Sequence, residues 1–282
     1  MKRLIAAAAA FAMVTALTTG AAQAKAADPV KALTAQLQSA RGVHFNSVSR
    51  IDPSLGFKTR TYGDLQFGRS RVTASEVTTT SSGTEPMSEE FTELFGEFSD
   101  TASKTITLKG ATYMSGGLLD WVGLPPGKTW VRLKTPGANL SGMGTAAINV
   151  LSPRELRTLL KSTTSKKPGG VVDGVATTLY TGSQRTNLTL ADVTITWTIN
   201  WKLWIGTGDG LIRRIATHDV LASPATKNAK ATKIVLASDT HLTGWGKKVW
   251  IDAPAEKDVV DLEDVLDDIL KPNVIGMINL GD

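Results

Sequence analysis

The segment from Val193 to Ile205 constrains the fold more than any other part of the chain, because its apolar residues recur with a period of two. This period is typical of a β-strand with one buried and one solvated face. The side chains that share the apolar face are Val193, Ile195, Trp197, Ile199, Trp201, Leu203 and Ile205. The other face is polar except for Trp204. At about 3.3 Å per residue the strand would be roughly 43 Å long, so we expect it to curve or to bend at a bulge.

A glycine-rich turn follows this strand. Residues 206–210 read Gly-Thr-Gly-Asp-Gly, and a second β-like run covers Leu211 to Leu221, so the two runs predict a hairpin. The alternating glycines are also found in phosphate-binding loops, but those loops lead into a helix whose N-terminus holds the phosphate. Because a strand follows here, the sequence does not predict a nucleotide site.

The first 24 residues have the pattern of an export signal. Lys2 and Arg3 precede an apolar segment from Leu4 to Leu17, and Ala22-Gln23-Ala24 fits a signal peptidase site. The chain has no cysteine, and therefore no disulfide, no thiolate metal site and no lipid-modified cysteine. We expect cleavage near Ala24 and a secreted, extracytoplasmic protein without a lipid-anchor cysteine.

The net charge and the absence of repeats further restrict the kinds of protein that this chain can be. The formal net charge of +5 is small and scattered, which argues against nucleic-acid binding. Residues 25–282 contain no internal repeat and no long linker, and they can bury a large core. We expect a single domain and a monomer, with transient contacts to a membrane or an envelope protein.

Four segments have the apolar spacing of amphipathic helices. The expected ranges are 28–41, 88–98, 152–161 and 259–270. Asp28 followed by Pro29 is a favourable start for the first, and Ser152 with Glu155 forms a capping box for the third. The helix at 88–98, with Phe91 and Phe95 on its apolar stripe, either plugs one end of the core or forms a lid over a pocket.

Runs rich in β-branched and aromatic residues, separated by glycine and proline, predict about 11 strands. The expected ranges are 43–51, 56–67, 70–80, 104–108, 111–115, 129–133, 175–183, 193–205, 211–221, 232–242 and 247–251. Weak alternation from Thr73 to Ser82 predicts an exposed or edge position. The segment Lys166-Lys167-Pro168-Gly169-Gly170 predicts a loop.

Candidate catalytic residues are few. The three histidines are His44, His218 and His241, and Asp219 and Asp239 lie near two of them. No G-x-S-x-G or H-E-x-x-H motif is present, although a triad of distant residues would leave no such motif. The sequence favours a protein without enzymatic activity, and it predicts no catalytic residue, metal site or cofactor.

The order helix, about six strands, helix, about five strands resembles the LolA-like carrier superfamily, and more closely its LppX/LprG branch of exported actinobacterial glycolipid-carrier lipoproteins. The resemblance covers the mature chain. The residues that carry it are Val30 to Phe45, Ala111-Thr112-Tyr113-Met114, Lys128 to Leu133, the helix after Ser152, and Leu203-Trp204-Ile205 with Asp209-Gly210-Leu211-Ile212-Arg213-Arg214. The missing anchor cysteine is a departure from that branch.

The resemblance implies an α+β fold, a curved antiparallel β-sheet or half-barrel with helices covering its concave face, and acyl chains held between the two. It therefore favours an exported, non-enzymatic binder or carrier of lipid or another hydrophobic ligand. The predicted ligand contacts are Phe91, Phe95, Leu156, Leu160, Ile195, Trp197, Ile199 and Trp201. Two alternatives stay open: the same side chains form an ordinary core, or the fold serves as a cell-envelope sensor or protein-interaction module.

Overall fold

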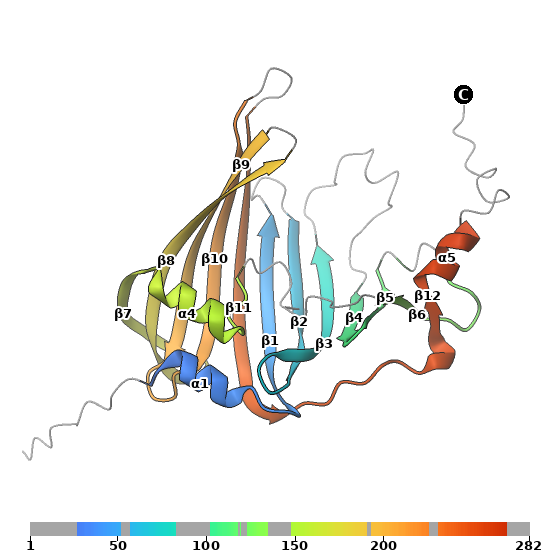
Figure 1. Ribbon diagram of the computed structural model, residues 1–282, viewed down its shortest axis with the longest axis horizontal. Coiled ribbons are helices and arrows are strands. Elements are labelled where there is room, and N and C mark those ends of the chain that lie inside the picture. Colours follow the sequence, from blue (N-terminus) through green and yellow to red (C-terminus); the bar gives the residue numbers. More distant parts are fainter. Residues whose placement is uncertain are drawn as a thin grey trace, which may run out of the picture.

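The strand predicted from its alternation lies inside a large open sheet. The computed structural model describes residues 27–51, 57–82, 102–117, 119, 123–134, 148–190, 193–225 and 231–269. These residues form one curved sheet of twelve strands and three α-helices (Figure 1). The α+β class and the curved sheet agree with the prediction, with twelve strands in place of about eleven.

The sheet falls into two halves that meet in the middle. The strands are β1 (Arg41–Ile51), β2 (Phe57–Phe67), β3 (Val72–Ser82), β4 (Ser103–Leu108), β5 (Ala111–Gly116), β6 (Trp130–Lys134), β7 (Thr163–Val172), β8 (Val175–Leu190), β9 (Val193–Gly206), β10 (Ile212–Ser223), β11 (Thr232–Lys248) and β12 (Val259–Asp261). Their order is β12-β6-β5-β4-β3-β2-β1-β11-β10-β9-β8-β7. All neighbouring strands are antiparallel except β12 and β6. The β1–β11 pair therefore joins an early strand to a late one.

The predicted loop at Lys166–Gly170 is wrong, because these residues belong to the edge strand β7. The register of β7 against β8 shifts between Pro168 and Gly170. Proline is tolerated at an edge because it lacks an N–H that a second neighbour would need. The predicted exposed or edge position of Thr73–Ser82 is also wrong, since Ser75–Thr79 pairs with both β2 and β4 and only Ser82 of this range is exposed.

The last predicted strands also differ from the structure. The run 232–242 continues to Lys248 as one strand, with Gly244 and Gly246 at positive φ. Residues 249–255 then cross the base of the sheet, where the N–H of Ile251 donates to Gln66 Oε1 at 2.8 Å (Figure 1). We call residues 249–255 the strap. The predicted strand at 247–251 is therefore the end of β11 followed by the strap.

The expected helix at 259–270 begins as a strand. Val259 to Asp261 pairs in parallel with Trp130 to Arg132 and forms β12, after a 3₁₀ turn at Glu256–Asp258. Helix α5 (Leu262–Ile269) follows. Two β-branched residues beside the open edge of β6 favour pairing over the first turn of a helix.

Two helices pack on one face of the sheet, which we call the inner face. They are α1 (Pro29–Gln36) and α4 (Pro153–Lys161), and their N-caps are the predicted Asp28 and Ser152. Leu33 of α1 and Leu159 of α4 are buried in the same core cluster as Phe45. Helix α1 ends earlier than predicted, and the helix expected at 88–98 lies outside the described residues. Within the described ranges, none of the helices combines the length and hydrophobicity that a membrane span requires.

Candidate functional site

The inner face is apolar where α1 and α4 cover it. The odd-numbered residues Ile199, Trp201, Leu203 and Ile205 of β9 are buried, whereas Asn200 and Lys202 are exposed. The face predicted from the period of two is therefore the face that carries the core. In the register of the β9–β10 hairpin, Leu203 lies opposite Ile215.

The structure brings most of the predicted ligand contacts together. Leu156, Ile199 and Trp201 are buried in one cluster, and Leu160 and Trp197 pack against it while partly buried. Ile195 is partly exposed and lies further along the same face of β9. The predicted contacts Phe91 and Phe95 lie outside the described residues. A ligand-binding role for this set stays a prediction.

Trp201 is fully buried on this face, against Gly182 of β8. A Cβ atom on Gly182 of β8 would lie 2.3 Å from Cζ2 of Trp201 and 2.6 Å from the carbonyl oxygen of Ser162, which caps α4. Only glycine leaves room for the indole between the strand and the end of the helix. Trp201 is thus a core residue, whereas Trp197 lies at the boundary of the helix-covered region.

The apolar face continues beyond the two helices. Strands β8 to β11 extend well past α4 in Figure 1, and this part of the inner face carries Trp197, Ile195 and Leu221. Trp197 and Leu221 lie opposite each other and are partly buried, and Ile234 of β11 is 42% exposed. Neither α1 nor α4 covers this region, so within the part of the chain that the structure describes it offers an apolar surface that an added molecule can contact.

A band of buried and partly buried hydroxyl groups crosses the inner face next to the apolar side chains of β9. We call it the hydroxyl band. Thr217 and Ser238 are hydrogen-bonded to each other at 2.9 Å, and Ser47 and Thr240 at 2.8 Å. Both pairs bridge neighbouring strands, and Thr240 has no exposed surface. The alternation of β9 gives no sign of this band, because its members lie on β1, β10 and β11.

Asp219 lies beyond the band and is 2% exposed. It lies opposite Ile199 in the register of β10 and β9. Burial raises the pKa of its carboxyl above the ordinary value, and the Thr217 hydroxyl, His218 and the Trp197 indole offset this only in part. Asp219 and His218 are neighbours in the sequence, but their side chains point to opposite faces of β10, where His218 is exposed and Asp219 is buried. The period of two that runs from Ile215 through Thr217 would have identified its burial.

Among the described residues, three buried polar atoms in this neighbourhood have no partner at hydrogen-bond distance and angle. They are Oδ1 of Asp219 and the Nε1 atoms of Trp197 and Trp201. Buried polar groups in proteins are almost always paired, so such a concentration marks a place where a bound group can be recognised.

The outer face is charged, and Trp204 has a defined place on it. The guanidinium of Arg214 lies 4.5 Å from the centre of the Trp204 ring and forms hydrogen bonds of 2.8 and 2.5 Å to Asp239. Asp239 raises the pKa of Arg214 through these bonds. The Trp204 exception to the alternation is thus a cation–π contact on the solvated face.

The histidines His44 and His241 also lie on the outer face. Nδ1 of His241 is 3.0 Å from Oδ2 of Asp173, at the turn between β7 and β8, and its Nε2 is 3.9 Å from Asp239. A groove of about 520 Å³ beside it is lined by both histidines and by the exposed Arg60. In the part of the chain that the structure describes, the His, Asp and Glu side chains form no group of three that could hold a metal ion.

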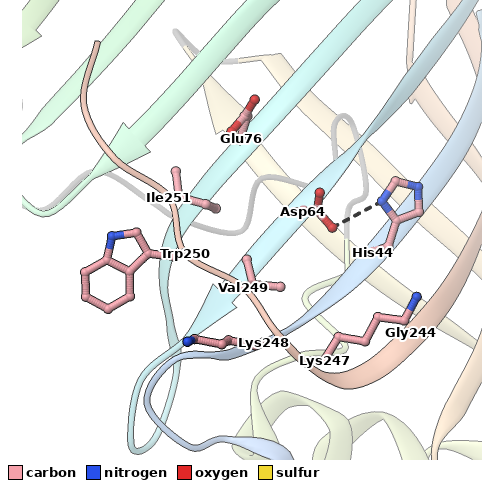
Figure 2. A pocket seen from close by; sticks show the side chains of 9 residues that line it. All are labelled: His44, Asp64, Glu76, Gly244, Lys247, Lys248, Val249, Trp250 and Ile251. Carbon is pink, nitrogen blue, oxygen red and sulfur yellow. Dashed lines mark hydrogen bonds and ion pairs between the residues drawn. The ribbon is translucent and has the colours of Figure 1, made fainter. Parts of the chain in front are cut away.

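A second outer-face pocket of about 340 Å³ lies between the strap and strands β1 to β3. Figure 2 shows that His44 and Asp64, 3.2 Å apart, face each other in it while the Trp250 ring points away. Glu76 also lines it and pairs with Lys104 at 2.5 Å. A charged lining of this kind does not fit an apolar ligand.

Comparison with known proteins adds little to this geometry. No protein-family model matches the chain, and no curated protein matches it. Among solved structures, the chain is similar to the crystal structure of a LolA superfamily protein from Nitrosomonas europaea, with a TM-score of 0.25 and 10% identity over 80% of this chain and 93% of that one.

Proposed function

We propose that this protein binds or carries lipid or another hydrophobic molecule, without converting it chemically, against the inner face of the sheet. The observation that carries the proposal is the continuation of the apolar face past α1 and α4, with Trp197, Ile195 and Leu221 on it. A flexible chain bound there would bury apolar surface that neither helix covers, at about 25 cal/mol per Å².

The chemistry of the surrounding positions supports this proposal. The inner positions of β9 from Ile195 to Leu203, of β10 from Ile215 to Leu221 and of β11 from Ile234 to Leu242 include one ionisable side chain, Asp219. The outer face, in contrast, carries Arg214, Asp239 and the histidines. An apolar ligand is therefore favoured on the inner face and disfavoured on the outer one.

The export pattern and the resemblance to LppX/LprG carriers support a location outside the cytoplasm. With no cysteine to hold a lipid anchor, we infer that the mature protein acts without covalent attachment to a membrane. Its contacts with a membrane or an envelope protein would then be transient.

Native mass spectrometry after mild purification, together with binding of the apolar dye N-phenyl-1-naphthylamine, tests the proposal. We expect a co-purified or added lipid to appear as a mass shift and the dye to gain fluorescence. Trp197→Ala should weaken dye binding about tenfold, because loss of a large aromatic contact costs roughly 1.5 kcal/mol. Tyr62→Ala is the matched control, since Tyr62 is on the outer face and 39% exposed.

A ligand-free protein that ignores the dye contradicts the carrier proposal. A stoichiometric protein partner that co-purifies without lipid would favour the sensor or interaction module instead. Equal weakening by Trp197→Ala and Tyr62→Ala would place binding elsewhere than the inner face.

A further inference from the structure

Asp219 is a carboxyl group placed where a hydrophobic ligand would lie. It is 98% buried on the inner face, opposite Ile199 of β9 on one side and Leu236 of β11 on the other. The described residues supply no ion pair to it. A carboxyl group in such a setting is unfavourable for stability unless it forms hydrogen bonds. The Thr217 hydroxyl lowers the pKa of Asp219 as a hydrogen-bond donor, and Oδ1 of Asp219 is left to accept a further hydrogen bond.

The indole of Trp197 is its neighbour. Trp197 lies opposite Leu221, two residues from Asp219 on the same face, and its indole is close enough to affect the pKa of Asp219. The indole lowers the pKa of Asp219 as a nearby hydrogen-bond donor would. Within the described residues, however, neither its N–H nor Oδ1 of Asp219 reaches a partner at hydrogen-bond distance and angle, although both atoms are buried. One unpaired donor and one unpaired acceptor therefore lie side by side at the edge of the helix-covered region.

We propose that these two atoms hold a hydroxyl group of the ligand, so that the bound molecule is an uncharged lipid alcohol. The hydroxyl donates its hydrogen to Oδ1 of Asp219, and its oxygen accepts the N–H of Trp197. This inference rests on the proposed function, because it names the class of ligand for the same site.

Other polar groups fit these two atoms less well. An ether or ester oxygen only accepts hydrogen bonds, and an ammonium only donates them, so each leaves one of the two atoms unpaired. A carboxylate or phosphate would bring a negative charge beside Asp219, and the inner positions of β9, β10 and β11 offer no cation to balance it. A hydroxyl is the simplest uncharged group that both donates and accepts.

The hydroxyl band fits the same orientation of the ligand. Thr217 is two residues from Asp219 on the same face and is hydrogen-bonded to Ser238. Each hydroxyl oxygen in such a pair retains acceptor capacity for a second polar group. The polar end of the ligand would then lie at the band, and its chain would run over Trp197 and Ile195 toward the uncovered end of the sheet.

The test compares two competitors with the same dodecyl chain that displace N-phenyl-1-naphthylamine from the mature protein. Dodecan-1-ol donates and accepts hydrogen bonds, whereas 1-methoxydodecane only accepts. We expect the alcohol to displace the dye at about tenfold lower concentration, because hydrogen bonds to a charged group contribute more than neutral ones.

Two variants test whether the preference for the alcohol over the ether depends on Asp219 and Trp197. Asp219→Leu should abolish this preference, because it removes the acceptor. Trp197→Phe keeps an aromatic ring and removes the N–H, so it should reduce the preference several-fold and keep the fold even where Asp219→Leu fails to fold. Asp64→Leu, which removes an outer-face carboxyl that is half exposed, is the control and should leave the preference unchanged.

The outcomes separate the two proposals. Dye binding with equal displacement by alcohol and ether, or an alcohol preference that is as large in Trp197→Phe as in the original protein, overturns the hydroxyl assignment and leaves the carrier proposal standing. No dye binding and no lipid in native mass spectrometry overturns both.

Discussion

At the scale of single residues, Gly182 decides whether Trp201 fits under α4. A methyl group at this position would overlap both the indole and the carbonyl oxygen of Ser162. We expect Gly182→Ala to lower the free energy of unfolding by about 1–3 kcal/mol, as overpacking does in other cores. Urea denaturation measures the change.

The control is Gly208→Ala in the β9–β10 turn, where an added Cβ meets nothing within 4 Å. This variant should stay within about 0.5 kcal/mol of the original protein. Equal effects of the two substitutions would show that the indole does not lie against Gly182.

Burial of the Asp219 carboxyl predicts that the stability of the protein depends on pH. Its pKa is raised in the folded protein by burial, so its contribution to stability is complete below the unfolded value of about 4 and is lost as the pH rises through the folded value. Asp219→Asn has no charge to bury. We therefore expect a melting temperature a few degrees above that of the original protein at pH 7, and equal values near pH 3.

Thermal melts of both proteins from pH 3 to pH 8 measure this difference, and acid effects elsewhere in the chain cancel between them. Asp64→Asn on the outer face is the control and should not reproduce the pattern. A melting temperature of Asp219→Asn below that of the original protein at pH 7 would mean that a favourable contact of the carboxylate outweighs its burial.

At the scale of elements, ion pairs between side chains join β12 to β6 in addition to the parallel strand pairing. Nε of Arg132 is 2.5 Å from Oδ1 of Asp261, and Nζ of Lys134 is 2.8 Å from Oδ2. Arg132 also binds Glu256 in the turn before β12. The hydrogen bonds from Arg132 and then Lys134 lower the pKa of Asp261 to about 2.

This lowered pKa predicts how β12 responds to acid. The contribution of Asp261 to stability is present above its ordinary value of 3.8 and is lost as the pH falls toward about 2. Asp261→Asn should raise the amide exchange rate of Val260 several-fold at pH 5, measured by hydrogen exchange. Glu263→Gln, an exposed change on α5, is the control, and equal exchange in both variants would contradict a role for the ion pairs.

At the scale of the whole molecule, the sheet separates two chemical environments. Its inner face carries the buried apolar cluster and the hydroxyl band, and its outer face carries the ion pairs of Arg214 and His241. The strap covers part of the outer face, where Ile251 joins Ile106 in a second small core. Ligand binding by such a molecule depends on how far the helices cover the inner face, and α1 and α4 cover one end of it (Figure 1).

The features that depend on near neighbours along the chain follow from the amino-acid sequence. The period of two identified the buried face of β9, and glycine-bounded runs located β1 to β6 to within about two residues at each end. Asp28 and Ser152 marked the starts of α1 and α4, because a cap acts on backbone N–H groups two or three residues away. These local interactions are readable without knowledge of the fold.

The features that depend on distant partners follow only from the tertiary structure. Lys166–Gly170 became a strand because β8 provides an edge, and Val259–Asp261 became one because β6 does. Whether Asp219 is buried beside an unpaired Trp197 depends on the register of β10 against β9 and β11. Pairing and burial of this kind are set by contacts across the sheet, so a local pattern of side chains does not specify them.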